Sequence, residues 1–214
     1  MSWINSSIVS MIRFMPRWSI HPFAKTYVAG ESIEETVLVV KQINARGFTC
    51  TLDILGEHVK SAAKADNITQ EYCNIYDTIA DENMSCNISI KLTHIGLALD
   101  KNIAADNLVR ILKRAKLHNN FCRIDMENST YTEQTIELYK DSVSNFPNMG
   151  IVLQAYLKRS LEDARDLNRQ GFNTRICKGI YDEPETIALQ DRIAIQDNFF
   201  KSLKKFYPVM VLLP

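Results

Sequence analysis

The stretch Asn87-Ile-Ser-Ile-Lys91 places a short apolar run directly before a lysine. Helical patterns separate it from four further runs, each of which also ends at a polar or charged residue. Alternating strands and helices are typical of parallel sheets, in which a crossover helix returns the chain to start the neighbouring strand. The sequence therefore predicts a parallel α/β fold. The four further runs are Phe48–Asp53, Phe121–Asp125, Gly150–Gln154 and Thr174–Lys178.

The terminal residues of these runs indicate where a functional site would lie. In a parallel β/α barrel the carboxyl ends of all strands meet at one mouth, where the chemistry takes place. We therefore expect Asp53, Lys91, Asp125, Gln154 and the Arg175/Lys178 pair to form a ring at that mouth. The runs are nearly continuous in apolar residues, which favours strands that are buried on both faces.

The intervening segments carry helix signals. Ser32 and Glu35 form a capping box, and Gly47 marks the end of the helix that follows. Further helices are expected from Asn67 or Thr69 to about Ala80, and over Ala104–His118, Thr132–Phe146, Ser160–Gln170 and Glu185–Phe206. A final apolar run, Pro208–Leu213, is expected to form a sixth strand.

The length of the chain limits this architecture. It has 214 residues, of which 46% are hydrophobic, enough for one sizeable core. A complete eight-stranded barrel usually needs about 250 residues. The expected fold is thus an incomplete (βα)8 barrel of about six parallel strands in a single domain, 1–214, with residues 1–30 as a lead-in and 31–214 as the βα units.

Composition excludes several other classes of protein. The 25 basic residues balance 25 acidic ones, which argues against nucleic acid as a partner. The five cysteines and four histidines are dispersed without metal-ligand spacing, so no metal site is expected and the thiols are expected to be free. No apolar run has the roughly 20 residues that cross a bilayer. The mildly hydrophobic segment Met1–Trp18 is expected to pack on the barrel.

Six motifs in order give the chain a family resemblance. The motifs are Tyr27-Val-Ala-Gly-Glu31, Leu52-Asp-Ile-Leu-Gly-Glu57, Ile88-Ser-Ile-Lys-Leu92, Ile124-Asp-Met-Glu-Asn-Ser129, Ile151-Val-Leu-Gln-Ala-Tyr-Leu157 and Arg175-Ile-Cys-Lys-Gly-Ile-Tyr181. Each motif alone is weak, but six at matching spacing are specific. With these motifs the chain resembles FAD-dependent proline dehydrogenase of the monofunctional type, a (βα)8 family that oxidises L-proline to Δ1-pyrroline-5-carboxylate.

The resemblance implies a role for each matching residue. Lys91 would lie beside the substrate carboxylate and the flavin, and Asp125 would line the proline pocket. Tyr181 would form the wall of the pocket on the side of the substrate. The cofactor would be FAD, with Gln154 on the flavin ring, Arg175 near its N5 edge and Lys178 at the ribitol-phosphate. Cys177 belongs to the same cofactor-binding motif. Asp53 and Glu57 would support the substrate wall, with Glu57 pairing with an arginine near the family's C-terminus.

The resemblance also implies partners and a location. Electrons would pass from the reduced flavin to a membrane quinone, which implies peripheral contact with the inner face of the membrane by a cytoplasmic protein. Members of the family continue for two more βα units, which carry a Thr-His segment and an Arg-Arg element. This sequence reads Val211-Leu-Leu-Pro214 at that point. We therefore expect a chain truncated at its C-terminus.

Three other interpretations remain open at this stage. The chain could be an inactive fragment, or half of a split protein completed by a C-terminal chain. It could also be a different barrel enzyme, in which Arg175 and Lys178 bind the phosphate of a substrate. Asp125 and Glu127 alternate in the predicted strand as a carboxylate pair of the kind that glycosidases use, but no other feature supports that chemistry.

Overall fold

The computed structural model of the protein describes residues 28–206. The chain divides into two compact units, one of residues up to 50 together with 82–85, and one of residues 51–81 together with those from 86 onward. Every residue predicted for the site lies in the second unit. The expectation of a single domain stays a prediction, and we describe each unit by itself.

The first unit contains helix α3, Ile33–Ala45. The capping box predicted from the sequence is present in part. The Ser32 hydroxyl accepts a hydrogen bond from the Glu35 N–H, and the Glu35 carboxylate accepts one from the N–H of Glu31, one residue before the cap. Gly47 ends the helix with a φ of 83°, a conformation that favours glycine.

Five strands form the sheet, in the order β1-β2-β3-β4-β5. The pairings from β2 to β5 are all parallel. The prediction of an incomplete β/α barrel is confirmed for these five strands. The sixth strand, expected over Pro208–Leu213, and the segment Met1–Trp18 lie outside the described residues. The strands are β1 Cys50–Leu52, β2 Cys86–Ile90, β3 Cys122–Ile124, β4 Met149–Gln154 and β5 Thr174–Cys177.

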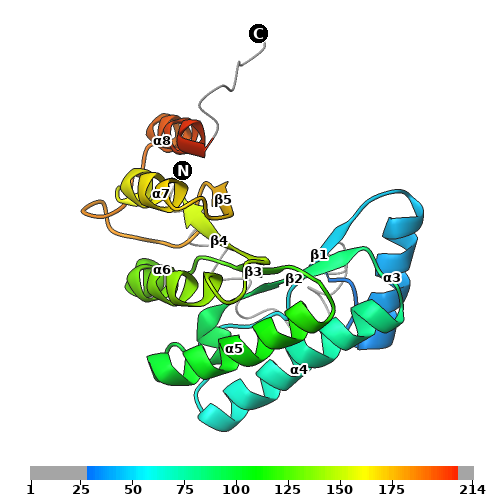
Figure 1. Cartoon of the computed structure of the whole chain (residues 1–214). Helices are drawn as coiled ribbons and strands as arrows, with labels where there is room; N and C mark the ends of the chain where they lie inside the picture. The colour runs from blue at the N-terminus through cyan, green and yellow to red at the C-terminus, as the bar shows by residue number, and fades with distance from the viewer. Residues whose placement is uncertain (1–27, 207–214) are drawn as a thin grey trace, which may run out of the picture. The chain divides into compact units, whose positions relative to one another are not determined.

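Helices follow the strands in alternation (Figure 1). Helix α4 contacts α5 and β2, α6 contacts β4, and α7 contacts both β4 and α8. In Figure 1 the helices α4 to α7 lie along one side of the strands of the second unit. They are α4 Ala62–Asp81, the short 3₁₀ helix η1 Leu92–Ile95, α5 Lys101–Leu117, α6 Ser129–Val143, α7 Ser160–Arg169 and α8 Arg192–Phe206.

The strand register separates two faces of the sheet. Ile90, Ile124 and Ile151 are aligned neighbours on β2, β3 and β4, and none of them is exposed. We call the face that carries these three isoleucines the helix face, and it forms the apolar core of the unit. The residues directly before and after each isoleucine along its strand point to the opposite face of the sheet, which we call the inner face. Its members on or directly after β2 to β5 are Ser89, Lys91, Arg123, Asp125, Gly150, Val152, Gln154, Arg175 and Cys177.

The expectation that all strands are buried on both faces is correct only for β4, in which every residue is buried. Thr51 on β1 and Arg175 on β5 are exposed. Both strands stand at the ends of the sheet order and carry polar side chains at these positions. The two outer strands are therefore only partly buried, although their sequence runs look continuous.

Several helix starts differ from the prediction. Helix α4 begins at Ala62 instead of near Asn67 or Thr69, because the Ser61 hydroxyl accepts a hydrogen bond from the Lys64 N–H and caps the helix earlier. Helix α6 begins at Ser129, because Asn128 is the cap.

Helices α5, α7 and α8 agree with the prediction to different degrees. Helix α5 begins at Lys101, three residues before Ala104, because the Asp100 side chain caps it. Helix α8 begins at Arg192 instead of Glu185, because residues 185–191 form turns and a bridge between Ala188 and Leu157. The prediction for α7 is confirmed, with the helix beginning at Ser160.

Candidate active site

Lys91 follows β2 and forms an ion pair with Asp53, which follows β1. The buried Tyr72 of α4 donates its hydroxyl hydrogen to the other oxygen of Asp53, at 3.1 Å. Burial alone would lower the pKa of Lys91, but the hydrogen bond and charge of Asp53, with the nearby carboxylates Asp125 and Glu127, raise it. Lys91 is therefore a permanently charged ammonium group, about one fifth exposed at the edge of the inner face.

Asp125 and Arg175 form a second ion pair, from β3 across to β5. Arg175 Nη2 donates to Asp125 Oδ1 at 2.8 Å. The Arg175 side chain is 48% exposed, and the bond to Asp125 uses one of its five N–H donors. The sequence predicted both residues for the site, one for substrate and one for cofactor, and the structure joins them directly.

Gln154 ends β4 at the centre of this group. Its Nε2 donates to the backbone carbonyls of Met126, at 3.0 Å, and Glu127, at 2.7 Å. These two bonds fix the plane of the amide. Oε1 is buried and has no hydrogen-bond partner among the described residues. A buried acceptor without a donor is costly, which marks it as a position where a ligand could donate.

The remaining cofactor candidates lie at the end of β5. Cys177 is the register partner of Gln154, and burial raises the pKa of its thiol. Lys178 is exposed, and its backbone carbonyl accepts a hydrogen bond from the Tyr156 N–H. The five cysteines are all free thiols, as the sequence predicted.

Glu57 and Tyr181 come from the loops after β1 and β5 and meet over the inner face. The Tyr181 hydroxyl donates to Glu57 Oε2 at 3.0 Å. Burial, and then the charge of Glu57, raise the pKa of the phenol, so it stays protonated and acts as a donor. The two residues predicted for the substrate wall and the substrate side are thus brought together.

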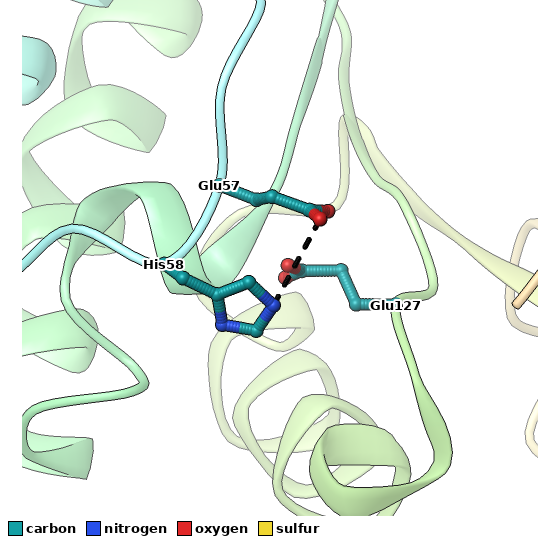
Figure 2. A group of neighbouring side chains, drawn as sticks. All are labelled: Glu57, His58 and Glu127. Carbon is teal, nitrogen blue, oxygen red and sulfur yellow. Dashed lines mark ion pairs between the residues drawn. The ribbon is translucent and has the colours of Figure 1, made fainter. Parts of the chain in front are cut away.

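A buried carboxylate, Glu127, lies beside this pair. The Thr93 N–H donates to Glu127 Oε1 at 3.0 Å, and the Thr93 hydroxyl donates to the other oxygen. The same hydroxyl accepts a hydrogen bond from the backbone N–H of His58 at 3.0 Å. Figure 2 shows Glu57, His58 and Glu127 converging, with the His58 ring 3.9 Å from a Glu57 oxygen.

These three side chains also have the chemistry of metal ligands. One potential ligand atom of each lies within 4.8 Å of the others. Both carboxylates also accept hydrogen bonds, Glu57 from Tyr181 and Glu127 from Thr93. The expectation that the chain holds no metal stays a prediction.

Comparison with known proteins identifies the family. The sequence profile described as proline dehydrogenase matches residues 37–197. The chain belongs to the proline dehydrogenase family. It is 35% identical to proline dehydrogenase 1 of Bacillus subtilis strain 168, over 92% of this chain and 65% of that protein. It is 33% identical to the proline dehydrogenase of Deinococcus radiodurans, over 86% of this chain and 61% of that protein.

The fold of the family is also seen among solved structures. Proline utilization A (PutA) from Bdellovibrio bacteriovorus, inactivated by N-propargylglycine, superposes with a TM-score of 0.76 at 24% identity, over 85% of this chain and 24% of that one. The chain spans somewhat less than two thirds of the length of the curated proline dehydrogenases that it matches. In the part that the structure describes, no helix combines the length and the apolarity needed to cross a membrane.

Three residues that support the candidate site were not predicted for that role from the sequence. Tyr72 and Thr93 carry no recognisable local signal for it, and Glu127 was considered only as a carboxylate partner of Asp125. Arg123 also stands on the inner face, two residues before Asp125, but it is not part of the site, because its guanidinium donates to Asn173 and lies over the Phe121 ring, at the amino ends of β5 and β3. Gly150, opposite Arg123, leaves room for its side chain, since an added Cβ would lie 2.9 Å from Arg123 Nη1.

The buried Glu127 predicts a pH effect on stability. Burial raises its pKa above the usual 4.5, against the opposing bonds from Thr93. A carboxyl group that is harder to ionise in the folded state than in the unfolded state stabilises the fold below pH 4.5, and this contribution is lost as the pH rises through the folded-state pKa. Replacing Glu127 by Gln removes the effect. The free energy of unfolding of the variant, minus that of the unmodified chain, should be larger at pH 8 than at pH 5. The increase should approach about 1.4 kcal/mol for each unit by which folding raises the pKa of Glu127.

Urea unfolding of both proteins at the two pH values measures this difference. Glu71→Gln, a change of an exposed carboxylate on α4, is the matched control and should leave the pH dependence unchanged. Equal pH dependence for Glu127→Gln and the unmodified chain would show that Glu127 is not a buried, destabilised carboxylate.

Proposed function

We propose that this chain carries the FAD and L-proline sites of a proline dehydrogenase and oxidises L-proline to Δ1-pyrroline-5-carboxylate. The observation that supports the proposal is the placement of Lys91, Asp125, Gln154 and Arg175. In a member of this family, all four lie on one face of consecutive parallel strands, with the first three at the carboxyl ends of β2 to β4 and Arg175 on β5 in contact with Asp125. A ring of this kind is where β/α barrels place their chemistry.

The residues present fit a flavin. A flavin ring offers both N–H donors and carbonyl acceptors along one edge. Gln154 Oε1 is a buried acceptor that receives no hydrogen bond from any of residues 28–206, so it could accept one from the ring. The partly exposed guanidinium of Arg175 supplies N–H donors. Arg175 and the exposed Lys178 supply positive charge for a reduced, anionic ring and for phosphate. Bound FAD would supply the acceptor for the hydride that L-proline loses.

The same face fits a small zwitterionic substrate. Lys91 can donate to a carboxylate with the ammonium hydrogens that Asp53 does not use. Asp125 offers a carboxylate for the cationic amine, and the pairing of Tyr181 with Glu57 covers the opposite side. These contacts would hold the substrate in one orientation and exclude water, and these are the main contributions that a protein makes to hydride transfer.

The path of the electrons is a further part of the proposal. By the resemblance they pass to a membrane quinone, which requires peripheral contact of the protein with the membrane. This acceptor, the membrane contact and a cytoplasmic location stay predictions. Proline-dependent reduction of a soluble quinone analogue in the presence and absence of lipid vesicles would test the first two.

Flavin binding tests the cofactor part directly. Arg175→Gln removes the cation and should weaken FAD binding about tenfold or more, because charge-assisted bonds to the cofactor are lost. Arg165→Gln on α7 changes an arginine of similar exposure outside the site and is the control. Titration by flavin fluorescence, with circular dichroism to confirm folding, measures both. Folded protein that binds no FAD, or binding equally tight in Arg175→Gln, would contradict the proposal.

A further inference from the structure

The loop of residues 178–191, between β5 and α8, is held near both of its ends by Tyr156, two residues after β4. The Tyr156 N–H donates to the Lys178 carbonyl at 2.8 Å, and the Leu189 N–H donates to the Tyr156 carbonyl at 2.7 Å. Gly179 has a φ of 110° and lies against the Tyr156 ring, where an added Cβ would come within 2.1 Å of a ring carbon. The two ends of the loop are therefore fixed in space.

The middle of the loop has a third attachment, at Glu183. Its Oε1 accepts a hydrogen bond from the Ser129 N–H at 2.6 Å, and its Oε2 accepts one from the Ser129 hydroxyl at 2.7 Å. The Glu183 backbone carbonyl also accepts a hydrogen bond from Gln190, at 2.8 Å. A side chain from the loop after β5 thus bonds, at two points, to a residue 54 positions earlier in the chain.

The attachment is well suited to a carboxylate. Ser129 is the first residue of α6, where the N–H groups lack partners within the helix and the helix dipole favours negative charge. Asn128 already caps the next N–H, that of Thr130. Glu183 therefore takes the donor that the local cap leaves free, through charge-assisted bonds that are stronger than neutral ones.

Tyr181 stands between the attachments at Gly179 and Glu183. Its ring packs against the cluster of Tyr156, Leu157 and Ala188, and its hydroxyl reaches Glu57. We propose that Glu183 is a positioning residue, which holds the loop on α6 so that Tyr181 closes the substrate side against Glu57. This inference rests on the proposed function for the identity of the substrate, L-proline. The positioning itself is a claim about the fold alone.

A comparison of thermal stability tests the positioning without any need for activity. Glu183→Ala is expected to lower Tm by about 4 °C or more, because two charge-assisted bonds to Ser129 are lost. Tyr181→Phe is expected to lower Tm by a smaller amount, because it removes the single hydrogen bond to Glu57. If Glu183 acts through Tyr181, the double variant should be no less stable than Glu183→Ala alone. Glu183→Gln, which keeps one acceptor oxygen, should fall between. Asp182→Asn removes the neighbouring exposed charge and should leave Tm unchanged.

Kinetics provide the second measurement. With FAD bound, Glu183→Ala should raise the KM for L-proline by about tenfold or more while its FAD affinity stays that of the unmodified chain. Additive losses of Tm in the double variant, or an unchanged KM, would overturn the inference and leave Glu183 as a helix cap alone. An unmodified chain that never oxidises proline would defeat the proposed function, and the Tm comparison would still decide the role of Glu183.

Discussion

Replacing Lys91 by Met should reduce proline-dependent turnover by about a hundredfold or more, the scale expected when a charged group that orients the substrate is lost. The reason is twofold. The substrate carboxylate loses its cation, and within residues 28–206 Asp53 keeps the Tyr72 hydroxyl as its one remaining side-chain partner. An unpaired carboxylate at the mouth would repel the carboxylate of the substrate. Steady-state reduction of an artificial electron acceptor by L-proline measures the effect.

Two further variants sharpen the interpretation of Lys91→Met. Lys113→Met changes an exposed lysine on α5 and should leave turnover as it was. Lys91→Met combined with Asp53→Asn removes both members of the pair and should bind proline better than Lys91→Met alone, because the unpaired negative charge is gone. If Lys91→Met kept most of its turnover, Lys91 would be only a solvated residue at the rim of the sheet.

Ile124, the last residue of β3, and Asp125, which directly follows it, should respond in opposite ways to replacement by alanine. Ile124 is fully buried on the helix face, so Ile124→Ala should cost about 2–5 kcal/mol of the free energy of unfolding. Asp125 lies on the inner face in a partly exposed pair with Arg175, so Asp125→Ala should cost less than about 1 kcal/mol. Turnover should follow the reverse order, with the larger loss in Asp125→Ala.

Urea unfolding and proline oxidation, measured on the same two proteins, check this contrast. It needs no outside control, because each variant is the control for the other. Large losses of stability in both variants would show that the two faces of the sheet are not divided as the register indicates. A fully active Asp125→Ala would remove Asp125 from the site.

The strand ends could be predicted because one physical rule places them. Parallel strands deliver their terminal side chains to the same edge, so Lys91, Asp125, Gln154 and Arg175 could be grouped from sequence spacing alone. The helix starts were less certain, because several capping residues stand within two turns of each other. Ser61 and Asn128 cap α4 and α6, although Asn67, Thr69 and Thr132 look equally suitable in sequence.

The supporting contacts of the site could not be predicted, because they join loops that are far apart in the chain. Glu127 lies past the end of β3, where strand alternation no longer applies, and its partner Thr93 is 34 residues away. Glu183 and Ser129 are 54 residues apart. Such pairs depend on how the loops fold over the sheet, and no local pattern of residues signals them.

One measurement bears most directly on the claim that the inner face is a single flavin and proline site. The chain loaded with FAD is mixed with L-proline in the absence of oxygen, and the loss of flavin absorbance is followed. The account predicts that the flavin is bleached in the unmodified chain and remains oxidised in Lys91→Met at equal FAD occupancy. Flavin that stays oxidised in the unmodified chain, or is bleached equally in Lys91→Met, would contradict it.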